Sequence, residues 1–361
     1  MDSPPPISTR DLARQLGLSH NTVARALRNL PHVSPATRER VLKAAEAAGY
    51  RASPLVTALM TQVRQHQRVK PTGEVVAYLT STATETEWRR LPSHVQQFEG
   101  ARHRAAELGF TLQPFWLGPH GGQARRVARI LSARGVRGSL LAPRPKTDED
   151  TLDLNWQAHA TVVIGYAMNG LRVHRAVHDS VTQIVTCHAR LRDAGCRRIG
   201  LALHRHQVPP ERPRWIAGYL GAQWRHGDET IPPLLYDSYS DNSAFLRWFD
   251  AHRPDAVIGI WPDHPLAWLR EHGVRVPRQV AYATLDLLGD QVGRLAGIRQ
   301  NNYGLGMAAM DLLAGQLFRN ETGIPPHPAT IIVEGSWMDG PTVVSRAGAV
   351  SKKRRPRVSS G

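Results

Sequence analysis

Cysteine is scarce in this chain of 361 residues, which contains only Cys187 and Cys196. Two cysteines are too few for a disulfide framework and lack the paired spacing of a zinc site, so we expect two ordinary thiols. Long apolar runs are missing as well, because no stretch approaches the roughly 20 apolar residues of a membrane helix. The N-terminus has neither the positive start nor the apolar run of a secretory signal. These absences predict a cytoplasmic protein with no membrane partner.

Acidic residues are few relative to basic ones, with 30 Asp and Glu against 46 Lys and Arg and a formal net charge of +16. Residues 1–70 contain eleven Lys and Arg against four Asp and Glu, which gives them a net charge of +7. Residues 351–361 add +5, and the remaining 280 residues carry only +4. A basic N-terminal module and a basic tail on a nearly neutral body favour a polyanionic partner such as nucleic acid.

The usual sequence marks of catalysis are absent. The chain contains no Gly-x-Ser-x-Gly elbow, no phosphate-binding Gly-rich loop and no His-Glu-x-x-His metal helix. We therefore predict no enzymatic activity, no cofactor, no catalytic residue and no metal ligand. The short run His204-Arg205-His206 is interpreted as exposed basic surface. An enzyme that uses a cleft of an α/β fold remains the alternative of a different class.

The first fifty residues are predicted to form three short helices, each opened by a capping residue. Helices over 9–16 and 20–28, joined by a turn at Gly17, have the sequence form of a helix-turn-helix. Ser34 followed by Pro35 is typical of the start of a third helix, because a proline at the first helical position leaves no amide unpaired. A solvated amphipathic helix with no partner is the alternative interpretation of the second helix.

The exposed side chains of these helices predict contacts with double-stranded DNA. Arginine suits guanine and asparagine suits adenine in the major groove, while small hydroxyl residues and helix starts suit phosphates. The candidate base-reading residues are His20, Asn21 and Arg25, and the candidate backbone contacts are Ser19, Thr22, Ser34 and Thr37.

Beyond Gly73 short apolar runs alternate with helical stretches, which is typical of parallel sheets covered by helices. The number of runs is sufficient for two lobes. The predicted strands cover 75–79, 112–116, 139–142, 161–165, 199–203, 256–260, 280–284 and 331–333, and the predicted helices cover 98–108, 123–133, 181–194, 215–226 and 305–317.

The N-terminal segments 7–13, 17–27, 33–41 and 48–51 closely resemble the headpiece of the lactose-repressor (LacI/GalR) family. The resemblance implies a homodimer that places one recognition helix per protomer into successive major grooves of a near-palindromic operator. Residues 53–60 are similar to the family's hinge helix, with Leu59 at the position that wedges into the minor groove. Ala52 and Thr57 depart from that pattern, and a plain linker is the alternative.

The body resembles the same family's periplasmic-binding-protein-like effector domain, most clearly at 193–201, 253–257, 273–277 and 300–306. This implies a small-molecule effector between two lobes, at the carboxyl ends of the strands. A saccharide is physically sensible, because carboxylates accept hydrogen bonds from hydroxyls and indoles cover sugar rings. Trp215 replaces a family arginine, with Arg214 beside it. The lining residues implied are Ser81, Thr82, Trp116, Arg214, Trp215, Trp261, Asp263 and Asp286.

The sequence thus predicts a fold of the α plus α/β class with four parts. Residues 1–52 form the headpiece, 53–70 the hinge helix and linker, 71–346 the two-lobed effector and dimerisation domain, and 347–361 a basic disordered tail. The function expected is that of a transcriptional repressor controlled by an effector. An architectural DNA-binding protein without an effector is the second alternative. The tail either adds sequence-independent grip on phosphates or stays solvated.

Overall fold

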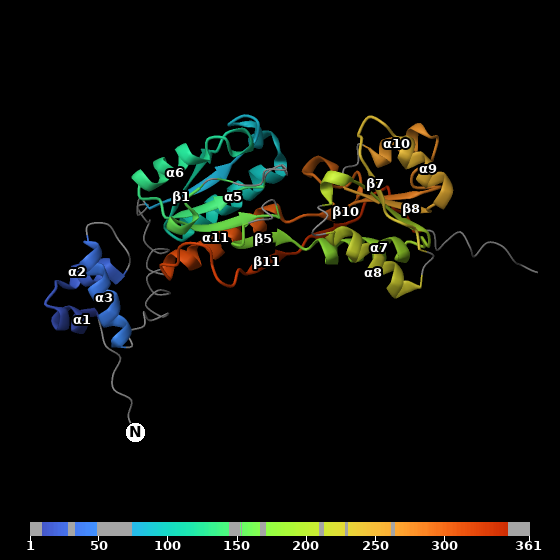
Figure 1. The fold of residues 1–361 in the computed structure, drawn as a ribbon. Coiled ribbons are helices and arrows are strands. Elements are labelled where there is room, and N and C mark those ends of the chain that lie inside the picture. The colour runs from blue at the N-terminus through green and yellow to red at the C-terminus, as the bar shows by residue number, and fades with distance from the viewer. Residues whose placement is uncertain are drawn as a thin grey trace, which may run out of the picture.

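The computed structural model describes residues 9–27, 33–48, 74–143, 152, 154–166, 171–208, 213–227, 230–260 and 264–345 (Figure 1). The predicted hinge helix with Leu59, the predicted tail, and Trp261 and Asp263 lie outside these residues. The domain boundaries proposed near residues 52, 70 and 346 therefore stay predictions.

The N-terminal part is a bundle of three helices, as the sequence predicts. These are α1 (Thr9–Leu16), α2 (His20–Leu27) and α3 (Pro35–Ala47). Leu12, Val23 and Val41, one from each helix, are fully buried and form its core. Gly17 has φ of +63°, a left-handed conformation that glycine adopts at little cost, and it turns the chain between α1 and α2.

The first lobe is a parallel six-stranded sheet in the order β11-β5-β4-β3-β1-β2. Helices α5 and α11 cover one face and α6 covers the other, which buries the sheet on both sides as parallel sheets require. The strands are β1 (Val75–Thr80), β2 (Thr111–Trp116), β3 (Gly138–Leu141), β4 (Ala160–Ile164), β5 (His174–His178) and β11 (Thr330–Val333), and the helices are α5 (Pro92–Glu107), α6 (Ala124–Ala133) and α11 (Asn302–Phe318).

The second lobe repeats this plan with the order β12-β10-β9-β8-β6-β7. Its strands are parallel except for β12, which runs antiparallel to β10 at the edge. One core of buried side chains lies between the sheet and α7 with α8, and another lies under α9 with α10. The strands are β6 (Ile199–His204), β7 (Leu234–Tyr236), β8 (Ala256–Gly259), β9 (Ala281–Thr284), β10 (Ala296–Arg299) and β12 (Ser336–Met338), and the helices are α7 (Ser180–Asp193), α8 (Arg214–His226), α9 (Ser243–His252) and α10 (Pro265–Glu271).

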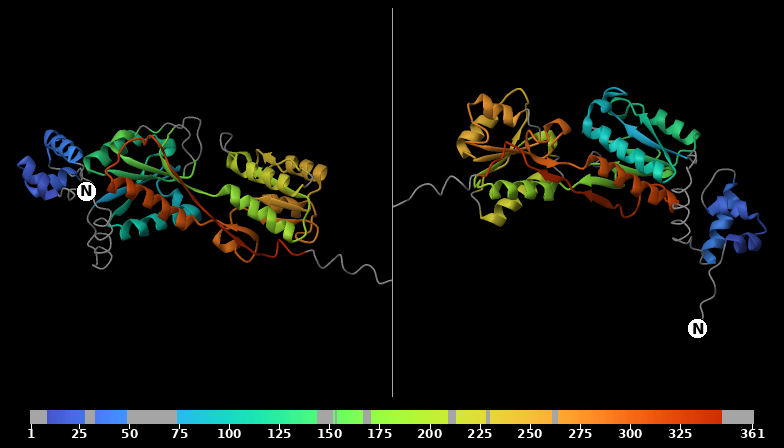
Figure 2. Two further views of the ribbon diagram at one scale, coloured as in Figure 1. Left: turned by 90° about the horizontal axis from the view of Figure 1, so that it is seen from below. Right: turned by 180° about the vertical axis from the view of Figure 1, so that it is seen from behind.

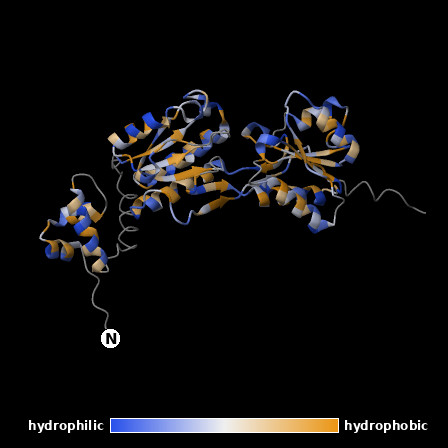
Figure 3. Cartoon of the chain, in the orientation of Figure 1, coloured by the Kyte–Doolittle hydropathy of each residue, from blue (hydrophilic) through white to orange (hydrophobic). Residues whose placement is uncertain are grey.

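Five single turns of 3-10 helix complete the described secondary structure: η1 (Glu87–Arg90), η2 (Pro119–Gly121), η3 (Trp156–Ala158), η4 (Arg205–Gln207) and η5 (Gly289–Gln291). Figure 3 shows apolar strands at the centre of both lobes and polar residues on the outer helix surfaces. No helix in the described part of the chain is both long and apolar enough to cross a membrane.

The chain crosses between the lobes three times, between β5 and α7, between β10 and α11, and between β11 and β12 (Figure 2). Each crossing is only one or a few residues long, around Asp179, Asn301 and Gly335. The amide of Asp179 donates to the carbonyl of Val333 at 3.0 Å, which ties the first crossing to the third. Short connections of this kind can act as a hinge. Each lobe can rotate as a rigid body, because only the few backbone dihedral angles of the connections need to change.

Candidate functional site

The N-termini of α2 and α3 are capped by hydroxyl side chains. Ser19 Oγ accepts from the amide of Thr22 at 3.0 Å and lies 2.8 Å from Thr22 Oγ1. Ser34 Oγ accepts from the amide of Thr37 at 3.2 Å and donates to Thr37 Oγ1 at 2.8 Å. Two of the four predicted phosphate contacts, Ser19 and Ser34, therefore cap helices in the free protein, and the other two, Thr22 and Thr37, supply the amides that they cap. Ser19 and Ser34 are exposed, so their hydroxyls also remain accessible to a phosphate.

The three candidate base-reading residues lie on α2. His20 and Asn21 are exposed and Arg25 is half-buried, one helical turn after Asn21 and on the same face. His20 Nε2 lies 2.9 Å from Thr9 Oγ1, a bond that joins the first turns of α1 and α2. At the other end of α2, Asn320 Nδ2 of the first lobe donates to the carbonyl of Leu27 at 2.8 Å. Sequence reasoning did not single out Asn320.

At the carboxyl ends of β1 and β2, three of the predicted effector residues lie close together. Trp116 Nε1 donates to the carbonyl of Thr82 at 2.9 Å, and Thr82 Oγ1 donates to the carbonyl of Thr84 at 2.9 Å. Ser81 is 5% exposed, and its Oγ is buried without a hydrogen bond. An unpaired buried hydroxyl is costly, and ligand sites commonly contain such groups.

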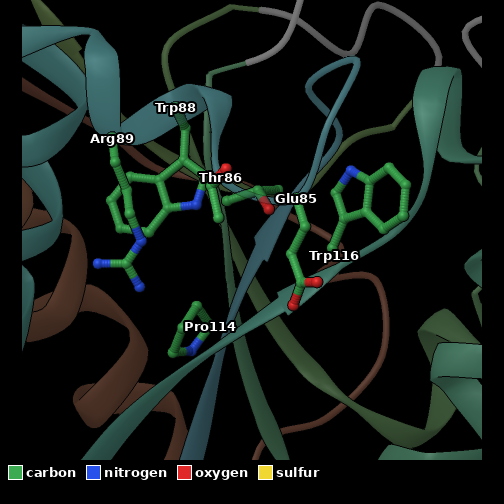
Figure 4. Close-up of a pocket in the computed structure, with 7 residues that line it drawn as sticks. Glu85, Thr86, Trp88, Arg89, Pro114 and Trp116 are labelled. Atoms are coloured by element: carbon green, nitrogen blue, oxygen red, sulfur yellow. The ribbon is translucent and has the colours of Figure 1, made fainter.

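A small pocket opens beside Trp116 (Figure 4). Its volume of about 60 Å³ admits one or two groups of the size of water, so it is too small for a whole sugar ring. Glu85 and Arg89, which follow β1, line it together with Pro114 of β2. Glu85 and Arg89 are two charged residues that sequence reasoning missed, because the segment between β1 and α5 showed no recognisable pattern. The complete lining is Thr80, Glu85, Thr86, Trp88, Arg89, Pro114 and Trp116.

In the second lobe, Asp286 follows β9 at the corresponding edge. Its Oδ1 is buried and makes no hydrogen bond, and burial raises the pKa of the carboxyl to about 6. The neighbouring Thr284 Oγ1 is already satisfied, because it donates to the carbonyl of Ile260 at 2.6 Å. A buried carboxylate oxygen without a hydrogen bond is suited to accept one from a ligand.

Arg214 and Trp215 have different environments although they are adjacent. Trp215 is 9% exposed and packs into the core between the second sheet and α7 and α8. The guanidinium of Arg214 lies 4.4 Å from the ring centre of Tyr166, a residue that follows β4 in the first lobe. Arg214 Nε is buried without a hydrogen bond. The cation–π contact therefore joins the two lobes, and of the pair it is Arg214 that faces the region between them.

Arg205 and His206, in η4, are exposed as expected, whereas His204, the last residue of β6, is half-buried. Both histidines also belong to an aromatic cluster that the sequence did not predict. The ring of His204 lies 4.1 Å from that of Tyr239 at an angle of 14°, and His264 lies 4.5 Å from Tyr239. His206 Nε2 lies 3.1 Å from the hydroxyl of Tyr239. Arg205, the basic residue between them, is exposed and paired with Asp237 at 2.5 Å. Among the described residues no cluster of His, Cys, Asp and Glu has a metal-binding arrangement.

A helix-turn-helix bundle joined to two α/β lobes, with unpaired polar atoms at the carboxyl ends of strands in both lobes, defines a transcription regulator built from a DNA-binding part and a binding-protein-like body. Residues 8–53 match the lacI family of bacterial regulatory proteins, and residues 188–342 match a periplasmic binding protein-like domain. The chain belongs to the lacI family and is a DNA-binding transcriptional regulator.

Individual relatives agree with this assignment. The HTH-type transcriptional regulator GalS of Salmonella typhimurium is 25% identical over 289 residues, which cover 78% of this chain and 80% of that protein. AglR of Rhizobium meliloti, also an HTH-type transcriptional regulator, is 45% identical over 56 residues, 16% of each chain.

Solved structures share the fold. A complex of the transcriptional regulator CelR with cellobiose is 21% identical with a TM-score of 0.60, and the match covers 93% of this chain and 99% of that one. The lac repressor dimer bound to operator and the anti-inducer ONPF is 18% identical with a TM-score of 0.56, covering 94% and 99%.

Proposed function

We propose that this regulator is a cytoplasmic homodimeric repressor whose binding to a near-palindromic operator is controlled by a saccharide held between its lobes. One observation carries the effector part of the proposal: three buried side-chain atoms without hydrogen bonds belong to the edges where the strands of the two lobes end. They are Ser81 Oγ in the first lobe and Arg214 Nε and Asp286 Oδ1 in the second. A hydroxyl, a guanidinium and a carboxylate together match the donors and acceptors of a polyhydroxylated ligand.

The ligand chemistry is supported by the aromatic residues near these atoms. The indole of Trp116 and the phenol ring of Tyr166 offer flat apolar faces, and Tyr166 already contacts Arg214. The cellobiose in the CelR complex, a protein of the same fold, is an oligosaccharide and supports the same class. The wider lining includes Thr82 from the described residues, and Trp261 and Asp263 as predictions from the sequence.

On DNA, Asn21 and Arg25 would read base edges together with His20, while Ser19, Thr22, Ser34 and Thr37 would contact the backbone. Leu59 would wedge into the minor groove between the half-sites. Rotation of the lobes about the three crossings would move the first lobe, and Asn320 provides a direct contact from that lobe to the end of α2. Effector and operator would then influence each other by linkage.

Selection of bound sequences from random duplex DNA, at a stated salt concentration, tests the operator part of the proposal. We expect enrichment of a near-palindromic site. Enrichment of no sequence, with DNA still bound, would favour the architectural alternative and contradict the proposal.

Calorimetric titration with cellobiose and related saccharides tests the effector part. We expect at least one saccharide to bind the wild type and to lose affinity at least tenfold with Asp286→Asn, because the variant replaces a charged acceptor with a weaker one. A matched variant, Asp250→Asn, changes an exposed carboxylate near the end of α9, 3.4 Å from His272 Nε2, and should leave affinity unchanged. Equal binding to all three proteins would contradict the proposed site.

A further inference from the structure

Helix α8 has one face buried and one apolar face open to solvent. Its inner face packs on α7, where a side chain on Gly218 would meet Ile184 Cγ2 at 2.4 Å. The opposite face carries the four exposed residues Ala217, Leu220, Gly221 and Trp224, spaced at i, i+3, i+4 and i+7. We call these four residues the α8 stripe. Figure 2 shows α8 on the outside of the second lobe.

The exposure of the α8 stripe is unusual for its residue types. Trp224 is 86% exposed, more than any other large hydrophobic side chain in the described part of the chain, and Leu220 is 41% exposed. Gly221 has open space around it, since a β-carbon there would meet no atom within 4 Å. The α8 stripe contains no charged residue, whereas Arg225 and His226 follow it at the end of the helix. An apolar centre beside a charged edge is the composition of a protein interface.

The sizes of the four side chains point to one occupant. From the order Ala217, Leu220, Gly221, Trp224, we infer that the α8 stripe binds a second copy of itself, with the two helices antiparallel. The midpoint between Ala217 and Trp224 is the same as the midpoint between Leu220 and Gly221. A two-fold axis through that midpoint places each Trp224 opposite the other copy's Ala217 and each Leu220 opposite its Gly221. Every large side chain then faces a small one, which satisfies the self-complementarity that a two-fold interface requires.

A parallel pairing would instead place Trp224 against Trp224 and Gly221 against Gly221. The large side chains would then clash, and the small ones would leave gaps.

The area of the antiparallel contact is limited by the length of the helix. A helix of 13 residues is about 20 Å long. Pairing of the stripes therefore buries on the order of a few hundred Å², less than the roughly 1,200 Å² typical of stable complexes. The α8 stripe would thus join two assemblies weakly, each already held together by a larger interface, and the doubled assembly would form only at high protein concentration.

Sedimentation velocity on the full chain over a series of high protein concentrations, without DNA or effector, tests this inference. We expect the wild type to include, in a proportion that rises with concentration, a species of twice the mass of the largest species formed by Trp224→Ala or by Gly221→Trp. The first variant removes the large side chain, and the second places a bulky side chain at a position where a β-carbon has open space. Ile332→Ala, which changes another exposed residue (52%) on β11 of the first lobe, should behave as the wild type.

Equal masses for the wild type and both stripe variants, all with wild-type circular dichroism, would overturn the inference. The result does not depend on the operator or the saccharide, so failure here is distinct from failure of the proposed function.

Cross-linking with a short bismaleimide tests the register. Leu220→Cys lies near the axis and should link to its own copy, while Ala217→Cys, displaced from its copy by about 10 Å along the helix, should not. The native Cys187 and Cys196 are fully buried and should not react. Equal linking at both positions would contradict the antiparallel arrangement.

Discussion

Arg25 is the residue on which sequence preference should depend most. It lies on α2 one turn after Asn21, where an arginine can donate two hydrogen bonds to a guanine in the major groove. We expect Arg25→Ala to lose about 1–3 kcal/mol of discrimination at one base position of the selected site. Competition binding with single-base variants of that site measures this loss.

Arg14→Ala serves as the control for this prediction. It removes the same charge from α1, where the Arg14 side chain is 84% exposed and 3.5 Å from Asp11. This variant should weaken binding to all sequences to the same small extent. Uniform weakening by Arg25→Ala as well would mean that Arg25 contacts phosphate only.

At pH 7 the Asp286 carboxylate should lower the free energy of unfolding, although it would contribute to effector binding. Its pKa is raised to about 6 by burial, so the folded state holds its proton more tightly than the unfolded chain does. This carboxyl therefore adds stability below pH 4 that is lost as the pH rises through 6. Asp286→Asn should accordingly stabilise the protein by about 2–3 kcal/mol at pH 7.

Urea unfolding of the wild type and Asp286→Asn between pH 5 and pH 8 measures this effect. The difference in unfolding free energy should grow as the pH rises, since only the wild type gains a buried charge. A difference that is independent of pH would show that the Asp286 carboxyl does not titrate as its burial predicts.

At the scale of elements, the closest helix packing in the first lobe depends on glycine. A side chain at Gly306 of α11 would lie 1.9 Å from the carbonyl oxygen of Gln97 in α5, and one at Gly100 would lie 2.0 Å from the carbonyl oxygen of Tyr303. We expect Gly306→Ala to destabilise the protein by about 3 kcal/mol or more, because the two helices must separate.

Gly315→Ala in the same helix provides the matched control, since its side chain would meet only the flexible end of Arg319 at 3.2 Å. This variant should be neutral or stabilising by up to about 1 kcal/mol, from the gain in helix propensity. Thermal unfolding measures the stability of both variants. Equal melting temperatures would contradict the role of close packing at Gly306.

Elements with strong local signals could be predicted from the sequence. Ser34 before Pro35 marked the start of α3, and the apolar run beginning at Val75 marked β1. Strands β5, β7, β10 and β12 were missed because they are short or contain polar residues, as in His174–His178. Helix α5 begins at Pro92, six residues earlier than expected, since its first turns contain few apolar residues.

The candidate site was only partly predictable for a related reason. Strand ends located Ser81 and Asp286 correctly at the edges of the sheets. The sequence could not show that Trp215 packs in the core while Arg214 reaches Tyr166, because that choice depends on the direction of one turn of α8. Nor could it place Glu85 beside Trp116, which requires the path of the chain after β1.

At the scale of the whole molecule, linkage makes the response reciprocal. If the saccharide changes operator affinity by some factor, operator must change saccharide affinity by the same factor. Titration of the effector with and without saturating operator duplex should therefore reproduce the ratio obtained from DNA binding with and without effector, and the expected coupling is about 5- to 150-fold.

Asp286→Asn should shift the effect of the saccharide on DNA binding to at least tenfold higher saccharide concentration while leaving operator affinity in the absence of effector unchanged. A saccharide that binds with equal affinity on and off the operator would show that the lobes do not communicate with the DNA-binding part.

The three crossings also set the order in which the chain can fold during its synthesis. The headpiece core uses only side chains from α1, α2 and α3, so it can form as soon as these have left the ribosome. The first lobe, by contrast, needs α11 over its sheet and β11 at its edge, which end at Phe318 and Val333. It must wait until nearly the entire protein has been translated, and the second lobe, from α7 to β10, emerges in the meantime. A nascent chain therefore acquires its DNA-binding part well before the sensor that would restrain it.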